Sequence, residues 1–216
     1  MIEIQQLNLV QGSFHLKDFD LKIERGAYTV LMGRSGCGKT SILEAVAGLR
    51  KIQSGTIRFG SRNVTHLKAA ERGVGYVPQD RALFPTLKVR DQLAFSLVIR
   101  RMSSAAIGQR VNELAKLLGI EHLLDRMPAG LSGGEAQRVA LGRAIAFKPS
   151  VLLLDEPLSA LDEDLHADMC QLLTAVHQKS EVSILHITHS HQEARQLGDS
   201  HFRLENSKAI PLHLND

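Results

Sequence analysis

The sequence predicts an α/β protein with a mostly parallel central sheet. Residues 151–154 form a continuous apolar run, which is typical of a strand that is buried on both faces. A second β-type run covers residues 182–188, and the segment between them, residues 165–179, has the apolar spacing of a helix. Two strands joined through a helix are the arrangement that parallel pairing requires.

The amino-terminal part of the chain is expected to contain strands joined by turns. Apolar and polar residues alternate there, most clearly from Phe19 to Ile23. The polar segment 24–26 interrupts this alternation before a further strand, which we expect over residues 28–32.

Helical spacing then takes over in two places. A helix is predicted over residues 39–49, and Ser54-Gly55 turns the chain into a strand over residues 56–59. Residues 89–147 are almost wholly helical in pattern. The apolar stripe of this longer segment consists of Leu93, Leu97, Val111, Leu114, Leu117 and Leu118.

Length and composition favour one domain over residues 1–216. A chain of 216 residues that is 44% hydrophobic can bury a core of its own. Residues 1–85 and 149–216 are expected to form the sheet-containing core, with residues 86–148 as an inserted helical subdomain.

The same sequence excludes several classes of protein. Its apolar stretches are far shorter than the roughly 18 residues of a membrane-spanning helix. The amino terminus lacks the pattern of a secretory signal, so we expect a cytosolic protein. Cys37 and Cys170 are too few for a disulfide framework or a zinc cluster. The formal net charge of +3 is mild, and the scattered basic residues indicate a solvated surface rather than a nucleic-acid patch.

A phosphate-binding loop is the strongest local signal. Residues 33–40 match the pattern G-x-x-x-x-G-K-[ST], between a predicted strand and a predicted helix. Backbone N–H groups and the helix dipole would therefore point at an anion. The residues of the loop are Gly33, Arg34, Ser35, Gly36, Cys37, Gly38, Lys39 and Thr40.

Individual roles follow from the chemistry of these side chains. The Lys39 ammonium would contact the β and γ phosphates, the Thr40 hydroxyl would take one position on Mg²⁺, and Ser41 could contact the α phosphate. A glycine-rich turn before a capped helix is the alternative reading. The loop alone also leaves kinases, GTPases and many ATPases open.

Two carboxylates end the apolar strand over residues 151–154. Asp155 could hold Mg²⁺, directly or through water, and Glu156 could orient and deprotonate an attacking water. A solvated pair of acids at a strand end is the alternative.

Two further polar residues follow predicted strands. Gln79 comes after the run 74–77, and His189 comes after the run 182–188. Each is a weak signal alone, but the carboxyl ends of strands are where open α/β sheets bind ligands. We therefore predict that Gln79 is a ligand or sensor for Mg²⁺ and the attacking water, and that His189 contacts the γ phosphate.

A second anion-binding helix terminus is predicted at residues 131–135. Ser132 and Glu135 match a capping box, which by itself needs no function. With Gly133 and Gly134 beside it, the same segment presents a helix amino terminus to an anion.

Together these segments resemble the ATP-binding cassette family, in the family's order and from about residue 1 to the end. The resemblance implies an ABC-type P-loop NTPase cassette, with an N-terminal antiparallel β subdomain beside the mostly parallel sheet and an inserted helical subdomain. It also implies an ATPase that uses ATP and Mg²⁺. The motifs that carry it are residues 33–40, Gln79, residues 131–135, Asp155-Glu156, Ser159-Ala160-Leu161-Asp162 and His189.

The resemblance further implies a head-to-tail homodimer with two shared ATP sites. Ser132, Gly133 and Gly134 of one copy would contact the γ phosphate held by the other copy. Asp162 would link the two sites across the interface. ATP would then stabilise the closed dimer and ADP would not, because only ATP has the shared γ phosphate.

Three segments resemble the importer ATPases for small solutes, and most of all the molybdate and tungstate branch. The sulfate, polyamine, ferric-iron and sugar branches share much of the pattern. The implied partners are integral membrane permease subunits and an extracytoplasmic solute-binding protein, without nucleic acid, and the implied place is the cytoplasmic inner face of the cell membrane. The segments are residues 76–80, 82–85 and 123–126.

Other functions for a cassette stay open. A soluble cassette of DNA repair or translation is the main alternative, although the long coiled coil, zinc insertion or tandem cassettes of those relatives are absent. A scaffold that binds ATP without turnover is a third reading, against which Glu156 argues. An exporter could use the same motifs.

The sequence departs from the importer pattern in three places. Arg34 stands where these importers usually have proline. No aromatic residue falls where one usually stacks on adenine, because Val10 or Gln11 lies there and Phe14 fits only with a shift. The chain ends soon after His189, so we expect no control through a carboxyl-terminal regulatory domain.

Overall fold

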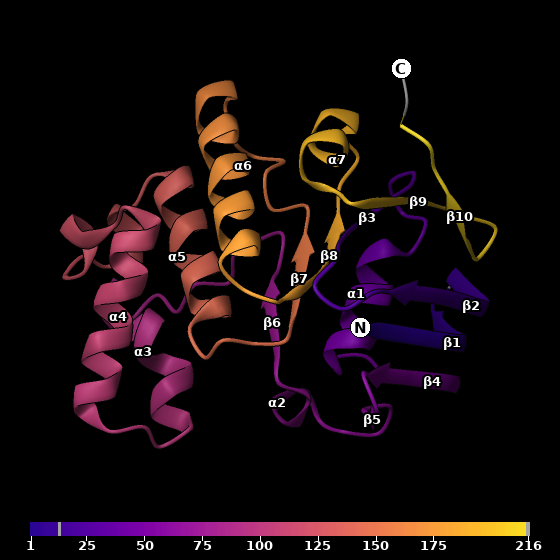
Figure 1. Ribbon diagram of the computed structural model, residues 1–216, viewed down its shortest axis with the longest axis horizontal. Coiled ribbons are helices and arrows are strands. Elements are labelled where there is room, and N and C mark those ends of the chain that lie inside the picture. The colour runs from indigo at the N-terminus through magenta and orange to yellow at the C-terminus, as the bar shows by residue number, and fades with distance from the viewer. Residues whose placement is uncertain (13, 215–216) are drawn as a thin grey trace.

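The protein has two β-sheets and seven α-helices in the residues that its computed structural model describes, 1–12 and 14–214 (Figure 1). The strands are β1 Ile2–Gln11, β2 Phe14–Ile23, β3 Tyr28–Met32, β4 Ser54–Phe59, β5 Arg62–Asn63, β6 Val74–Val77, β7 Val151–Asp155, β8 Ser183–Ile187, β9 Ser200–Glu205 and β10 Lys208–Pro211. The α-helices are α1 Lys39–Ala47, α2 Ala69–Arg72, α3 Val89–Ile99, α4 Ser104–Leu118, α5 Gly133–Ile145, α6 Glu163–Gln178 and α7 His191–Leu197.

The larger sheet has the strand order β10-β9-β3-β8-β7-β6. Its strands β9, β3, β8, β7 and β6 pair in parallel, and β10 pairs antiparallel to β9 at the edge. Every residue of β7 and of β8 is buried, which the continuous apolar run 151–154 predicted for β7. The predicted mostly parallel sheet is thereby confirmed, and so is the crossover helix between β7 and β8.

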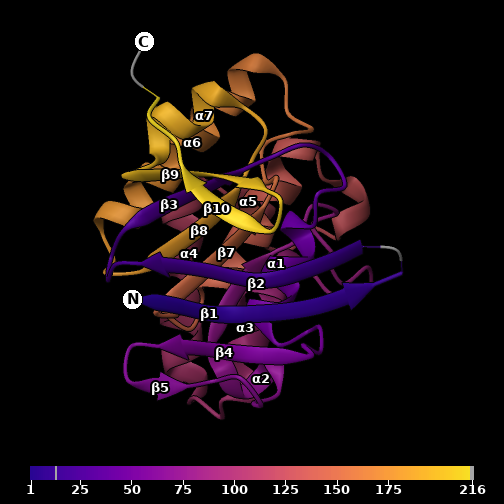
Figure 2. The same cartoon turned by 90° about the vertical axis from the view of Figure 1, so that its right-hand side faces the viewer.

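The smaller sheet is antiparallel and has the order β2-β1-β4-β5 (Figure 2). The alternation from Phe19 to Ile23 gives β2 a buried face, which includes Phe19, Leu21 and Ile23. The predicted helix over residues 39–49 ends earlier, at Ala47. It stops there because Gly48 takes a left-handed conformation, with φ of 80°, and its N–H bonds the carbonyls of Ala45 and Glu44.

The helices α3, α4 and α5 lie together at one end of the molecule, on the left in Figure 1. The short 3₁₀ turns Glu121–Leu123 and Pro128–Gly130 join α4 to α5. Most of the predicted apolar stripe faces the interior, since Leu93, Leu97, Val111, Leu114 and Leu118 are buried and Leu117 is half-buried. The helical pattern of residues 89–147 is therefore confirmed.

The core has two layers, one on each face of the larger sheet. Leu152 and Leu154 of β7 belong to the cluster that packs against the helices α3 to α6. Val151 and Leu153 belong to the cluster that includes α1 and the strands β1 and β2. Alternate residues of a strand point to opposite faces, so the apolar run 151–154 supplies side chains to both layers.

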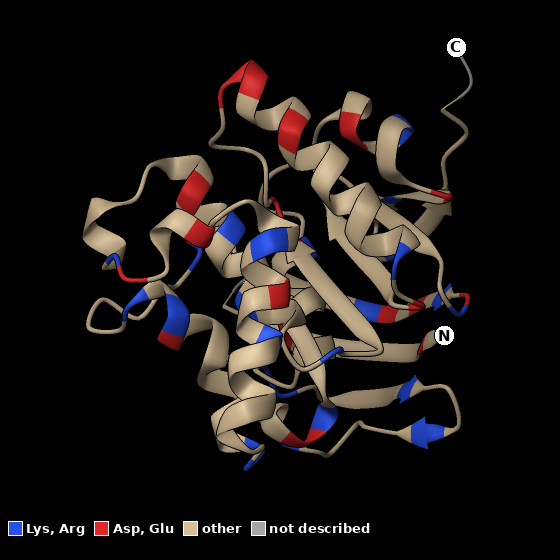
Figure 3. Cartoon of the chain, turned by 60° about the vertical axis from the view of Figure 1, so that its left-hand side comes forward, with Lys and Arg blue, Asp and Glu red and all other residues tan. Residues whose placement is uncertain are grey.

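Surface charge is mixed, and Lys and Arg alternate with Asp and Glu over the side that Figure 3 shows. Within residues 1–12 and 14–214, no helix combines the length and the apolar character that crossing a membrane requires.

Candidate functional site

Four of the segments predicted from sequence lie at one end of the larger sheet, directly beyond the carboxyl ends of its parallel strands. The phosphate-binding loop follows β3, Asp155 ends β7, His189 follows β8 and Gln79 follows β6. Parallel pairing of these four strands puts their carboxyl ends side by side. The fold therefore gathers four segments that are far apart in the chain.

The loop has the backbone that its glycines permit. Gly36 and Gly38 have φ angles of 75° and 99°, in the left-handed region that other residues avoid. A Cβ at Gly38 would also lie 2.0 Å from the ring of Phe14. Gly38 thus allows both the turn into α1 and the close approach of an aromatic side chain.

Lys39 is folded back over the loop. Its ammonium donates hydrogen bonds to the carbonyl oxygens of Gly33, at 2.9 Å, and Arg34, at 3.0 Å. The side chain is buried although it is charged. Both of these hydrogen bonds go to neutral carbonyl groups, and a phosphate could take the place of those groups around the cation.

Thr40 and Asp155 meet at the end of β7. The Thr40 hydroxyl donates a hydrogen bond of 3.1 Å to the Asp155 carboxylate. Burial raises the pKa of Asp155, and the hydrogen bond from Thr40 opposes that effect. A hydroxyl and a buried carboxylate are hard oxygen donors of the kind that Mg²⁺ binds, and a nearby cation would favour the ionised carboxylate. These two residues fit a magnesium ion.

Glu156 and His189 form the second contact of the site. A Glu156 carboxylate oxygen lies 3.2 Å from Nδ1 of His189. Glu156 has a φ of 45°, which is unusual for a residue with a side chain. Its backbone N–H donates to the carbonyl of Ile187, at 2.9 Å, so β8 holds this conformation.

Gln79 stands apart from these contacts. It is exposed in the turn after β6, and within residues 1–12 and 14–214 it takes no part in the hydrogen bond between Thr40 and Asp155. The following loop is instead tied to α5. The Arg143 guanidinium donates to the carbonyls of Ala82, at 2.7 Å, and Arg81, at 3.0 Å. No sequence pattern pointed to Arg143, because its partners are backbone atoms of a distant segment.

The second helix terminus has the predicted capping box. The Ser132 N–H donates to the Glu135 carboxylate at 2.7 Å, and the Glu135 N–H donates to the Ser132 hydroxyl at 3.3 Å. Ser132 and Gly133 are exposed. Asp162 caps α6, where its carboxylate accepts from the Leu165 N–H at 3.0 Å.

Two residues near the loop were not assigned from the sequence. The Phe14 ring covers Gly38, and Gln11 accepts a hydrogen bond of 2.5 Å from the Ser41 hydroxyl. The sequence placed Val10 or Gln11 where an aromatic residue usually stacks on adenine, and Phe14 fitted only with a shift. The hairpin of β1 and β2 places Phe14, the first residue of β2, against Gly38 of the loop.

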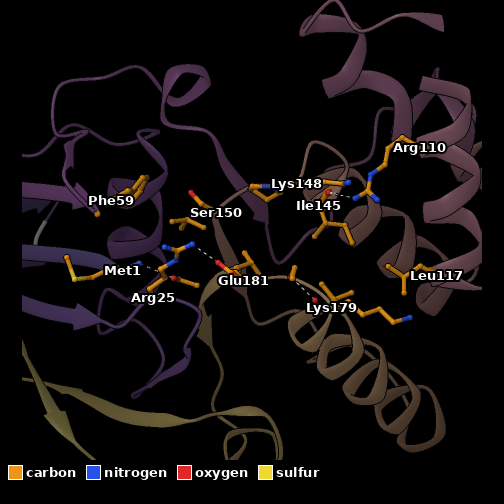
Figure 4. A pocket seen from close by; sticks show the side chains of 17 residues that line it. Met1, Arg25, Phe59, Arg110, Leu117, Ile145, Lys148, Ser150, Lys179 and Glu181 are labelled. Atoms are coloured by element: carbon orange, nitrogen blue, oxygen red, sulfur yellow. Dashed lines mark hydrogen bonds and ion pairs between the residues drawn. The ribbon is translucent and has the colours of Figure 1, made fainter. Parts of the chain in front are cut away.

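A large cavity of about 750 Å³ lies elsewhere, at the opposite ends of the strands (Figure 4). It opens beside the starts of β7 and β8 and is lined by residues such as Arg25, Phe59, Lys148 and Lys179. None of the predicted site residues lines it. The candidate site lies at the other ends of these strands.

Comparisons with known proteins agree with this geometry. The family model described as ABC transporter matches residues 16–159. The molybdate/tungstate import ATP-binding protein WtpC of Thermococcus kodakarensis is 44% identical over 86% of this chain and 56% of its own length. The maltose/maltodextrin import ATP-binding protein MalK of Escherichia coli is 43% identical over 92% of this chain and 54% of its own.

Solved structures of ABC transporter cassettes are also similar to this chain. The dimeric structure of a bacterial ABC transporter cassette superposes with a TM-score of 0.88 at 27% identity, and each chain is covered completely. A post-hydrolysis state of that cassette, bound to ADP and Pi, superposes equally well at 26% identity. The chain spans about half the length of the curated relatives that it matches. With its sheet topology, its loop and these matches, the chain belongs to the ABC transporter family.

Proposed function

We propose that this chain is the ATP-hydrolysing subunit of an ABC transporter, which powers import of a small solute through a separate permease. The observation that carries the proposal is the pairing of Glu156 with His189 beside the contact between Thr40 and Asp155. A proton acceptor and a magnesium site at the mouth of a phosphate-binding loop are the parts that phosphoryl transfer to water needs.

Each group of site residues has its own role in ATP hydrolysis. The loop N–H groups and the Lys39 ammonium bind and orient the phosphates of ATP. Thr40 and Asp155 would hold Mg²⁺, with Gln79 as a further ligand or sensor, and the bound ion supplies positive charge to the phosphate oxygens. The Glu156 carboxylate orients a water molecule and accepts its proton, and His189 contacts the γ phosphate.

Adenine is held by Phe14 in this proposal. The ring already lies against Gly38 at the start of α1, and its side chain is half-buried. An aromatic face at that position can stack on a base without reading its edges. Ser41, next to the loop, would contact the α phosphate.

The working unit is a head-to-tail homodimer. Ser132, Gly133 and Gly134 would bind the γ phosphate held by the second copy, and Asp162 would link the two sites. The exposure of Ser132 and Gly133 at a helix amino terminus supports this role, as does the dimeric state of the solved cassette. Residues 1–85 and 149–216 would then act as the core and residues 86–148 as the helical subdomain.

The permease would dock on α3 and the loop after Gln79. Val98 and Ile99 of α3 expose 58% and 62% of their surfaces, and Phe95 and Met102 are exposed beside them in the chain. Exposed apolar side chains so close together, on a helix and just after its end, indicate a protein contact. The subunit would be cytoplasmic, peripheral on the inner face of the cell membrane, and an extracytoplasmic solute-binding protein would deliver the solute.

The solute is proposed to be molybdate or tungstate, or another small solute. One relative is named for molybdate and tungstate, a second for sulfoquinovosyl glycerol and a third for maltose and maltodextrin. All three relatives are named as import or transport ATP-binding proteins, which supports a role in solute transport whichever solute is carried.

The test combines mass and turnover. Purified Glu156→Gln protein should form a dimer with Mg-ATP and remain a monomer with Mg-ADP, as measured by light scattering. The wild-type protein should hydrolyse Mg-ATP, alone or with its permease. A Glu156→Gln protein that stays monomeric with Mg-ATP, even when the permease is present, would contradict the shared site.

A further inference from the structure

A buried cluster of ionisable side chains lies next to the segment that carries His189. Its centre is Glu193 of α7, whose side chain is buried. One carboxylate oxygen of Glu193 lies 2.9 Å from Nε2 of His166 on α6. The other lies 3.5 Å from Nε2 of His186 on β8. The carboxylate is therefore shared between two imidazoles from two different elements.

The neighbours of these imidazoles set which ring nitrogen carries a proton. The Tyr28 hydroxyl lies 2.9 Å from Nδ1 of His186, and the Cys170 sulfur lies 3.8 Å from Nδ1 of His166. Burial raises the pKa of Tyr28, and it raises the pKa of Cys170 to about 11. Both groups therefore keep their protons and can donate to Nδ1, which leaves an Nε2–H on each ring to face Glu193.

Glu193 is ionised in this setting. Burial alone would raise its pKa, but the neighbouring His186, His166 and Thr188 together outweigh burial and lower it. The result is a pKa of about 2 for Glu193. The groups that face the carboxylate are thus His166 from α6, His186 and Thr188 from β8 and its end, and Tyr28 and Cys170 one contact further out.

The cluster connects three elements that lead into the candidate site (Figure 1). His186 lies on β8, three residues before His189. His166 lies on the first turns of α6, where its N–H donates to the carbonyl of the cap residue Asp162 at 2.8 Å. Tyr28 opens β3, which runs into the phosphate-binding loop.

The two contacts of the Glu193 carboxylate differ in length. The contact of Glu193 with His166 has the length of a good hydrogen bond, whereas 3.5 Å to His186 is long for one. The two atoms of that longer contact have no other hydrogen-bond partner among the described residues. Each of these buried polar atoms has only the other as its partner in that part of the chain. Moving them apart would leave both unsatisfied, which costs free energy of folding.

We propose that Glu193 is a positioning residue that holds the His189 segment against the α6 helix capped by Asp162. This rests on the proposed function, because it assigns Glu193 a part in turnover. Glu193 ties the start of α7 to β8 and to α6. His189 lies in the short turn between β8 and α7, so fixing these two elements also fixes the turn that carries His189. Glu193 itself touches neither phosphate nor water in this role.

Glu193→Gln is the first variant. The amide keeps the shape of the side chain, but its NH₂ group would face an imidazole N–H, so one of the two contacts is lost. We expect kcat for ATP hydrolysis to fall about 10- to 100-fold, the effect of a small misplacement of a reacting group, with KM for Mg-ATP unchanged. The unchanged KM follows because Glu193 makes no contact with the loop.

Asp168→Asn is the matched control. Asp168 lies on the same helix as His166 and its carboxylate lies 3.6 Å from the Arg138 guanidinium, so this variant also converts an ion-paired acid to an amide. Its kcat should equal that of the unchanged protein. A thermal melt of each variant verifies that the protein assayed is folded.

A second readout is independent of turnover. The ring resonances of His189, identified by their loss in His189→Gln protein, should shift in Glu193→Gln and not in Asp168→Asn. A folded Glu193→Gln protein with unchanged kcat and unchanged His189 resonances would overturn the inference. Absence of hydrolysis by the unchanged protein with its permease would instead sink the proposed function, and the resonances would still decide the role of Glu193.

Discussion

Glu156 and His189 are 3.2 Å apart although 33 positions separate them in the chain. The contact exists because β7 and β8 are adjacent parallel strands and each residue follows the carboxyl end of its strand. His189 is 66% exposed and Glu156 is 20% exposed, so the carboxylate is shielded while the imidazole is open to a ligand. This arrangement suits a base that activates water beside a group that contacts phosphate.

Replacement of Glu156 by Gln should separate binding from turnover. We expect ATP binding to persist and hydrolysis to slow by roughly 10² to 10⁴, because an amide cannot accept the proton of the attacking water. Nucleotide titration and a phosphate-release assay measure the two effects. Unchanged turnover in this variant would remove Glu156 from the mechanism.

Replacement of Lys39 by Ala should abolish useful ATP binding. The buried ammonium donates hydrogen bonds to two loop carbonyls, and its loss removes the charge that would bind the β and γ phosphates. Titration with ATP measures the effect, and Arg34→Ala serves as the control for a loss of charge at the loop tip. Normal ATP affinity in Lys39→Ala protein would contradict the assignment of the loop.

Replacement of Phe14 by Ala should weaken binding of ATP but not of inorganic tripolyphosphate. Loss of stacking costs about 1–3 kcal/mol per base, which raises the dissociation constant for ATP by roughly 5- to 150-fold. Tripolyphosphate has no base and should bind as before. Phe95→Ala, on α3, is the matched control. Equal weakening for both ligands would mean that Phe14 only supports the shape of the loop.

Replacement of Arg143 by Ala should loosen the loop that follows Gln79. Two hydrogen bonds from a charged group to loop carbonyls are lost, and even one such bond contributes about 1.5–3 kcal/mol. Amide hydrogen exchange over residues 79–84 should therefore accelerate at least about tenfold. Arg90→Ala, which breaks an exposed ion pair with Asp125, should leave exchange in that loop unchanged.

Glu193 predicts a particular acid response of stability. Its pKa of about 2 in the folded protein is below the value of about 4.3 in an unfolded chain. A lowered pKa contributes stability above the unfolded value, and this stability is lost as the pH falls from about 5 towards 2. The difference in free energy of unfolding between the unchanged protein and Glu193→Gln should therefore shrink over that range. Urea titrations at several pH values measure it, and a constant difference would show that Glu193 is not the group responsible.

Local patterns in the sequence determined the elements and their order. The apolar run 151–154 predicted a strand buried on both faces, because consecutive apolar residues present apolar side chains to both sides of a sheet. The glycines of residues 33–40 and the capping box at Ser132 are equally local, since turns and caps depend on residues a few positions apart. The family also followed from such motifs.

Tertiary structure alone decided which side chains meet. Strand order brought His189 to Glu156, the register of β1 and β2 brought Phe14 to Gly38, and packing of α5 brought Arg143 to the loop after Gln79. The cluster around Glu193 joins residues from β3, β8, α6 and α7, none of which forms a motif with the others. Such contacts depend on how distant elements pack, and that information has no fixed spacing along a chain.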